Sequence, residues 1–226
     1  MKANKLVIKT QSKSYPIYFG NKNLFKTGLL IKKNLPKVKK IFIIADRKVP
    51  KKFLKNLLKS LKKYHIKIYK LQANEKNKDL LNAQKIIEII LKNNFNRTDC
   101  IIALGGGMVG DLSAFVSNLT KRGLKFINIP TTLLSQVDAS IGGKTGINTN
   151  QGKNLIGTFY QPDFVISDVS LLQSLPKREM ISGYGEILKH ALILNKKFFI
   201  WLTKNANKII NNKNNKKLTE AIVKSS

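Results

Sequence analysis

The sequence is poor in acidic residues, arginine, cysteine and tryptophan. Among its 226 residues 12 are acidic and 42 are cationic, which gives a formal net charge of +30 at pH 7. The one cysteine, Cys100, excludes an internal disulfide and fits the reducing environment of the cytoplasm. No apolar run approaches the ~18 residues of a membrane span, and the first ten residues, MKANKLVIKT, lack the apolar stretch of a signal peptide. We therefore expect a cytoplasmic protein without membrane contact.

The scarcity of arginine changes the meaning of the positive charge. Four of the 42 cationic residues are arginines and the other 38 are lysines, spread along the chain among many Asn and Ile residues. Specific recognition of nucleic acid favours arginine forks and stacked aromatic side chains, and neither is clustered here. The pattern favours compositional drift, typical of A/T-rich codons, with the lysines on solvated faces. The alternative is a polyanion-binding role. We expect no specific nucleic-acid partner.

Apolar runs of strand length alternate with segments of helical spacing. With 42% hydrophobic residues, the chain can bury a core. Strands that alternate with helices indicate an α/β fold with a mainly parallel sheet. The predicted strands are 6–9, 15–19, 41–45, 66–71, 100–104, 125–129 and 164–168, and the predicted helices between them are 23–33, 50–63 and 79–94.

The strand signals stop beyond Pro176. Helical patterns follow at 178–205 and about 214–226, and the second continues to the end of the sequence without a cap. We expect an α/β domain over residues 1–178. Residues 179–226 are expected to be only the beginning of an all-helical domain, with apolar faces that are cut before they can pack together.

A glycine-rich turn lies between a strand and a helix in CIIALGGGMVGDLSAFVSN, residues 100–118. Gly105, Gly107 and Gly110 fit the spacing G-x-G-x-x-G, which lets the backbone approach a pyrophosphate at a helix N-terminus. Glycines also serve any tight strand-to-helix turn, so this spacing alone leaves both interpretations open. The turn does not follow the first strand, and no acid lies ~20 residues further on to hold a ribose. The candidates for that acid are Asp46, Glu75 and Asp111.

A second segment, IPTTLLSQVDASIGGKTGIN (129–148), surrounds Lys144 with glycines and small polar residues. Its GKT triplet suggests a nucleotide phosphate loop, but that loop needs G-x-x-x-x-G-K-[ST] at the start of a helix. Asp138 stands at the first glycine position, and GIN follows where a helix would begin. The phosphate-loop interpretation therefore fails. An anion-binding lysine and an exposed loop lysine remain as alternatives.

Four motifs together resemble the 3-dehydroquinate synthase family of sugar-phosphate cyclases: LGGGMVGD, IPTTLLSQVDASIGGKTGIN, GKNLIGTFYQP and SGYGEILKHALI. The resemblance runs from about residue 41 to the end and is densest at 100–193. It implies an N-terminal NAD-binding, Rossmann-like α/β domain and a C-terminal helical metal-binding domain, with the active site between them. It also implies conversion of 3-deoxy-D-arabino-heptulosonate 7-phosphate to 3-dehydroquinate and phosphate, on the route to chorismate. NAD would oxidise one carbinol transiently, with no net redox change.

The resemblance assigns roles to individual residues. For the anionic sugar-phosphate substrate it implies Asp138, Lys144, Asn154 and Lys189, together with Arg122 from a neighbouring subunit of a homodimer. For the cofactor it implies Glu75, Lys78, Gly107, Asp111, Thr131, Thr132, Lys153 and the 171–174 stretch with Leu171 and Ser174. The motifs themselves add Asp46, Gly106, Gly110 and Lys144 as cofactor-binding candidates. The sequence ANEKNKD (73–79) departs from the family's usual D-G-E, with Ala73 and Asn74 in place of the first two residues.

The resemblance implies that Glu186 is a ligand of zinc or cobalt, with two histidines from a later segment. His190 lies four residues after Glu186, on the same helical face. A site made by these two residues is disfavoured, because the family's other ligands come from further along the chain.

Family members are considerably longer than this chain, so the resemblance implies a truncated copy, one half of a split enzyme or a partial sequence. We expect the 226 residues alone to form no dehydroquinate. The alternatives are a cyclase for another sugar phosphate, a metal-dependent polyol dehydrogenase, and a non-catalytic relic retained for NAD or polyanion binding.

Overall fold

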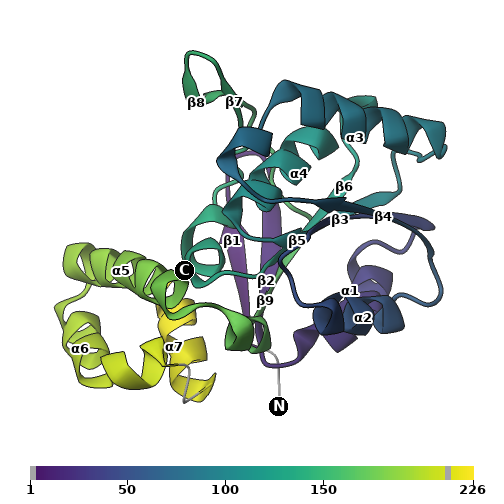
Figure 1. Cartoon of the computed structure of the whole chain (residues 1–226). Coiled ribbons are helices and arrows are strands. Elements are labelled where there is room, and N and C mark those ends of the chain that lie inside the picture. Colours follow the sequence, from purple (N-terminus) through teal and green to yellow (C-terminus); the bar gives the residue numbers. More distant parts are fainter. Residues whose placement is uncertain (1–3, 212–214) are drawn as a thin grey trace.

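The centre of the molecule is a seven-stranded sheet with the strand order β1-β2-β9-β6-β5-β3-β4 (Figure 1). The computed structural model describes residues 4–211 and 215–226. The pair β1–β2 is antiparallel, and every other neighbouring pair in the sheet is parallel. The strands are β1 (Asn4–Lys9), β2 (Ser14–Gly20), β3 (Lys40–Asp46), β4 (His65–Leu71), β5 (Cys100–Gly105), β6 (Lys125–Pro130) and β9 (Phe164–Asp168). The predicted α/β fold and all seven predicted strands are confirmed.

Helices cover both faces of the sheet, and successive side chains of the buried strands alternate between them. Helices α1 (Thr27–Asn34) and α2 (Lys51–Ser60) pack on the face that carries Ile41 and Ile43. Helices α3 (Leu80–Lys92) and α4 (Gly107–Leu119) pack on the face that carries Phe42 and Ile44. Because both faces are covered, β3 and β5 read as continuous apolar runs.

The strand order creates a switch point between β3 and β5. After β3 the chain moves outward to the edge strand β4, and it then returns to add β5 on the other side of β3. The loops that leave the carboxyl ends of β3 and β5 therefore run in opposite directions. Ligands of open α/β sheets bind in the crevice that such a divergence leaves.

A small hairpin stands apart from the main sheet, and it was absent from the elements predicted from the sequence. Strands β7 (Ile147–Thr149) and β8 (Gly152–Ile156) pair with each other and project beyond the sheet at the top of Figure 1. Only Ile147 at its base joins the main core. The hairpin was missed because its residues are mostly polar or glycine and do not alternate as a half-buried strand does.

Three helices follow the sheet: α5 (Lys177–Leu194), α6 (Lys196–Ile210) and α7 (Asn215–Ser225). The single helix predicted over 178–205 is wrong, because the chain breaks at Asn195. That residue is extended, with φ −157° and ψ 94°, and its side chain accepts a hydrogen bond from Phe198 N at 2.9 Å. Asparagine is a preferred N-cap, so it ends one helix and begins the next. The helix predicted near 214–226 is confirmed.

The three helices share one apolar cluster with β2 and β9. Val165 of this cluster pairs with Asn128, which in turn pairs with Ala103 on the face that α3 and α4 cover. Helices α5, α6 and α7 therefore cover the same face of the sheet as α3 and α4. Leu202 and Ile222 are fully buried. The expectation that the apolar faces of 179–226 stay unpacked is therefore wrong for the faces that carry Leu202 and Ile222, whereas Leu192, Ile193 and Leu194 at the end of α5 are exposed. The boundary at 178/179 stays a prediction. No helix among the described residues is long and apolar enough to cross a bilayer.

Two glycines of α5 allow a paired test of this packing. A Cβ built on Gly183 would lie 2.6 Å from both Leu133 Cβ and Leu134 N, whereas a Cβ on Gly185 would meet nothing within 4 Å. Gly183→Ala should lower the free energy of unfolding by about 1–3 kcal/mol, because α5 must move off the 133–134 segment. Gly185→Ala, the matched control, should raise it by up to ~1 kcal/mol. Thermal and urea unfolding measure both, and equal effects would contradict the close contact.

Candidate functional site

The turn between β5 and α4 lies at the switch point and is kept narrow by glycine. Thr131 N donates to Gly105 O at 2.9 Å, which brings the end of β6 beside the turn. A Cβ on Gly106 would lie 3.1 Å from Thr132 Cγ2, and one on Gly107 would lie 3.2 Å from Ala139 Cβ. Larger residues would push the 131–139 segment away. The predicted cofactor residues Gly106, Gly107, Thr131 and Thr132 therefore do meet.

The first turn of α4 is arranged for an anion. Gly106 is the N-cap and has no side chain to accept a hydrogen bond from the helix, and the first turn contains no acidic residue. The positive end of the helix dipole and its free N–H groups are therefore available to a phosphate. Gly110 lets the helix approach the sheet, since a Cβ there would lie 3.2 Å from Asn128 Nδ2.

Asp46 lies at the carboxyl end of β3, on the other side of the switch point. Its Oδ1 accepts from Lys48 N at 3.0 Å and from Ala73 N at 3.4 Å, so backbone donors fix the carboxylate. Asp46 and Leu104 line a cavity of about 210 Å³. A fixed acid at this place has the position of a group that binds a nucleotide ribose.

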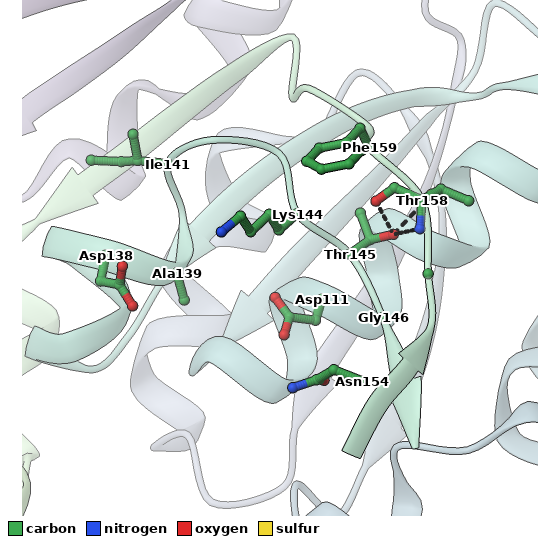
Figure 2. A pocket seen from close by; sticks show the side chains of 11 residues that line it. Asp111, Asp138, Ala139, Ile141, Lys144, Thr145, Gly146, Asn154, Thr158 and Phe159 are labelled. Atoms are coloured by element: carbon green, nitrogen blue, oxygen red, sulfur yellow. Dashed lines mark hydrogen bonds between the residues drawn. The ribbon is translucent and has the colours of Figure 1, made fainter. Parts of the chain in front are cut away.

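A larger cavity of about 520 Å³ lies between the start of α4, the 138–146 loop and the β7–β8 hairpin (Figure 2). Four predicted site residues line it together: Asp111, Asp138, Lys144 and Asn154. Figure 2 shows the ammonium of Lys144 extended to the side where Asp138 and Ala139 lie. One cation and two carboxylates thus face a cavity whose volume is typical of small-molecule sites.

Glycines in the left-handed region present Lys144 to this cavity. Gly142 has φ +93° and Gly143 has φ +69°, conformations that side chains rarely adopt. A Cβ on Gly143 would also lie 2.5 Å from the side chain of Gln161. Lys144 itself is exposed, and its backbone bridges to Phe159. Within the described residues it forms no salt bridge, so its charge is available to a ligand.

Asp138 lies on a single π-helical turn, Ser135–Ala139. Ser140 N donates to Ser135 O at 3.0 Å, which is the i→i+5 bond of such a turn. Buried Gln136 holds the segment against the sheet, since its Nε2 donates to Pro130 O and Asp168 O at 3.1 Å each. The loop that carries Asp138 is therefore fixed by the ends of β6 and β9.

Lys78 links the cofactor side to the cavity. Its Nζ donates to Asp111 Oδ2 and to Asn154 Oδ1, both at 2.6 Å. Burial raises the pKa of Asp111 above its ordinary value, and the hydrogen bond and charge of Lys78 oppose that rise. Glu75, in the same turn as Lys78, accepts from Asn148 Nδ2 through its carbonyl at 2.9 Å and its Oε2 at 3.0 Å. Sequence reasoning missed Asn148, whose only signal is its place at the end of the GKTGIN segment.

Glu186 lies on α5, and its side chain contacts Lys189 and His190 rather than other acids. Its Oε1 contacts Lys189 Nζ and lies 3.1 Å from His190 Nε2, and His190 Nδ1 lies 2.7 Å from Ser225 Oγ. The pKa of Lys189 is raised, mainly by its hydrogen bond to Glu186 and further by the charge of Asp138. Lys189 therefore lies within electrostatic reach of the cavity without lining it. No group of three possible metal ligands occurs in the described part of the chain.

Arg122, Lys153, Leu171 and Ser174 also line none of these cavities. Arg122 is exposed, on a turn where Lys121, Arg122 and Gly123 all have positive φ. Lys153 is exposed on β8, and Ser174 is exposed at the end of the Val169–Ser174 turn. Leu171 is 2% exposed and packs in the core with β3 and β5, so its side chain offers no contact to a ligand. Their functional roles stay predictions.

The fold and the placement of the cavities define the class: a doubly wound α/β protein with its candidate site at the carboxyl ends of the strands. A family model described as "3-dehydroquinate synthase N-terminal" matches residues 68–182. The chain belongs to this family, as its motifs predicted.

Relatives and solved structures agree with this assignment. The 3-dehydroquinate synthase of Pelagibacter ubique (strain HTCC1062) is 54% identical over 206 residues, which are 91% of this chain and 56% of that protein. That of Buchnera aphidicola subsp. Cinara cedri is 44% identical over 205 residues, 88% of this chain and 54% of that protein. The chain thus spans about half the length of the curated relatives that it matches.

Among solved structures, 2-deoxy-scyllo-inosose synthase complexed with carbaglucose-6-phosphate, NAD+ and Co2+ has 27% sequence identity and a TM-score of 0.78. The alignment covers 84% of this chain and 51% of that one. The 2-epi-5-epi-valiolone synthase of Streptomyces hygroscopicus subsp. jinggangensis 5008, with NAD+ and Zn2+ bound, has 24% identity and a TM-score of 0.82 over 97% of this chain and 60% of that one. This second similarity concerns the fold alone.

The Lys78–Asp111 pair gives a direct test of the site's electrostatics. Lys78→Met removes the cation that opposes the effect of burial, so Asp111 should titrate at higher pH than in the unchanged protein. Carboxyl ¹³C NMR with aspartate labelling measures the shift. Lys76→Met, which removes an exposed lysine from the same turn, should leave the Asp111 titration unchanged. A lower Asp111 pKa in Lys78→Met would contradict the pairing.

Proposed function

We propose that this chain carries the nucleotide- and substrate-binding part of a 3-dehydroquinate synthase. The reaction would convert 3-deoxy-D-arabino-heptulosonate 7-phosphate to 3-dehydroquinate and phosphate. The observation that carries the proposal is the 520 Å³ cavity, in which Lys144, Asp138, Asp111 and Asn154 converge next to the glycine turn of α4. Family membership and the similarity to cyclases over most of the chain support it.

NAD fits the switch point by two features of this structure. The glycine turn leaves room that a Cβ would fill, and the start of α4 offers uncapped N–H groups to a pyrophosphate. Asp46, fixed by backbone donors, would hold the adenosine ribose. When bound, NAD supplies reversible hydride transfer. The chain's own residues orient it: Thr132 and Ala139 bound the turn, and Asp111 lies one helical turn after Gly107.

The residues of the cavity would bind the sugar phosphate. Lys144 would pair with an anionic group, since its ammonium is exposed and the glycines before it keep the backbone clear. The amide of Asn154 and the carboxylate of Asp138 would bind hydroxyl groups and fix the orientation of the ring. Lys189 would add positive charge from α5. The walls of the cavity, Ile141 and Phe159 among them, would limit access of water.

A divalent metal does not fit the described residues by themselves. A catalytic zinc site needs three protein ligands and an open position, and around Glu186 the described residues add only His190, together with the cation Lys189. We derive no step through a metal. Glu186 would contribute one ligand to a zinc or cobalt ion, and in a homodimer Arg122 would reach the neighbouring site.

A cyclase for another sugar phosphate is the second candidate, favoured by the structural similarity to 2-deoxy-scyllo-inosose synthase. Parallel assays with the heptulosonate phosphate and with glucose 6-phosphate separate the two. One half of a split enzyme, or a non-catalytic remnant, would bind ligand without turnover. We also propose that the protein acts in the cytoplasm and has no specific nucleic-acid partner. Its four arginines are dispersed among the lysines and do not form the clustered forks that read bases.

Cofactor choice is the first test. We expect the chain to bind NAD in preference to NADP, because the fixed carboxylate of Asp46 would repel a 2′-phosphate. Isothermal titration calorimetry with each dinucleotide measures the preference. Asp46→Asn should narrow it while retaining NAD binding. No heat with NAD, or tighter binding of NADP by the unchanged chain, would overturn the assignment of this site.

Lys144 is the second test. The chain would be co-expressed with the part of the Pelagibacter ubique relative that lies beyond the matched region, and phosphate release from the heptulosonate phosphate would be followed with NAD and zinc or cobalt. Lys144→Ala should lower turnover by raising the activation free energy by roughly 2–4 kcal/mol, the size expected for a charge contact that strengthens in the transition state. NAD affinity should change less. The control Lys62→Ala removes an exposed lysine after α2, and an equal effect there would return Lys144 to an ordinary loop residue.

A further inference from the structure

Lys78 stands apart from the other lysines of the described chain because it alone is buried, with 3% of its surface exposed. A buried ammonium is stable only when its charge and its donors are satisfied. Here Nζ donates to Asp111 Oδ2 and to Asn154 Oδ1, both at 2.6 Å. The two partners belong to different segments: Asp111 to the first turns of α4 and Asn154 to β8. The Lys78 ammonium thus joins the 75–78 turn to helix α4 and to the β7–β8 hairpin.

The backbone around Lys78 is joined to the same hairpin. Lys78 O accepts from Asn148 N at 2.6 Å, and Asn148 Oδ1 accepts from Asn154 N at 3.0 Å. Asn148 Nδ2 also donates to Glu75. The hairpin is therefore fastened to the 75–78 turn by side-chain and main-chain hydrogen bonds together. This network includes Asn154, through its backbone N–H and its side-chain amide oxygen.

The chemistry of Lys78 fixes which way the amide of Asn154 faces. An ammonium only donates, so the amide oxygen of Asn154 must face Lys78 and its NH₂ group must face away. Asn154 also has φ +57°, a left-handed conformation that asparagine tolerates better than most residues. Asn154 lines the cavity, and Figure 2 shows its nitrogen turned to the side on which Asp138 lies. The two amide hydrogens are therefore offered to a ligand in the cavity.

We propose that Lys78 is a positioning residue that acts through Asn154: it holds the hairpin in place and directs the Asn154 amide donors into the sugar-phosphate cavity. This goes beyond a contact between Lys78 and the cofactor, and it rests on the proposed function where it names the ligand. Loss of the Lys78 ammonium would free the Asn154 amide to rotate and would loosen the hairpin, which would keep its hydrogen bonds to Lys78 O and Glu75, with Lys144 and Asp138 left in place.

The first experiment needs no ligand. Hydrogen exchange of the unliganded chain, read by mass spectrometry, should be at least several-fold faster over residues 147–156 in Lys78→Met than in the unchanged chain. The matched control Lys76→Met should exchange at the unchanged rate, because Lys76 is exposed in the same turn. If Lys78→Met fails to fold, Lys78→Gln replaces it, since glutamine retains a donor but not the charge. Unchanged exchange in a folded Lys78 variant overturns the proposal.

The second experiment is a double-mutant cycle on binding, measured by calorimetry with NAD present and the heptulosonate 7-phosphate as titrant. Lys78→Met and Asn154→Ala should each weaken binding on the order of tenfold, the size of one charge-assisted hydrogen bond. When Asn154 is already alanine, adding Lys78→Met should weaken binding of the sugar phosphate by less than about a further twofold. Additive losses overturn the proposal and leave Lys78 a cofactor contact. If the unchanged chain does not bind the sugar phosphate, the proposed function fails, while the exchange experiment still decides the role of Lys78.

Discussion

The candidate site depends on the close approach of two turns at the carboxyl ends of β5 and β6. The space between Gly106 and Thr132, and between Gly107 and Ala139, is smaller than a methyl group needs. This contact sets the start of α4 against the segment that carries Asp138. The glycine turn proposed to bind the dinucleotide and the 520 Å³ cavity then share a wall, because Asp111 follows the turn and lines the cavity. The proposed transient oxidation of a carbinol of the sugar phosphate, with hydride transfer to NAD, would need the two binding sites to be this close.

The second constraint is charge. The cavity contains two carboxylates, Asp111 and Asp138, and each would weaken the binding of an anion if it acted alone. Lys78 forms a salt bridge with Asp111, whereas Lys144 lines the cavity and has no salt-bridge partner among the described residues. The negative charge of Asp111 is thereby neutralised by Lys78. The positive charge of Lys144 faces Asp138 across the cavity and stays available to an anion. Lys189 extends the positive field from α5 towards Asp138.

Much of the fold could be predicted from the sequence because local patterns and burial agree in it. Strands such as Ile41–Ala45 are buried on both faces and read as apolar runs, and the glycines at 105–107 mark a turn in which a larger residue would crowd its neighbours. The hairpin 147–156 could not be predicted, since hydrogen bonds from Asn148 and Lys78 hold it rather than an apolar face. The break at Asn195 was hidden by apolar spacing that continues across it, and only the capping preference of asparagine could have indicated it. Motif resemblance named Asp138, Lys144 and Asn154, but the route by which Asn154 is held comes from tertiary contacts alone.

The lysine excess shows why composition is a weak guide to function in this chain. With 38 lysines, composition alone gives no reason to single out one of them, and the drift that favours lysine on solvated faces applies to all. Burial separates them physically. A lysine on the surface keeps its hydration and tolerates replacement, whereas Lys78 has exchanged water for Asp111 and Asn154 and cannot lose either partner without leaving a buried charge unpaired. Lys144 differs in the opposite way: it is exposed, yet two left-handed glycines and the bridge to Phe159 fix the backbone from which it extends. Lys78 is therefore distinguished by burial and Lys144 by the backbone from which it extends, and a surface lysine such as Lys62 carries the same charge without either constraint.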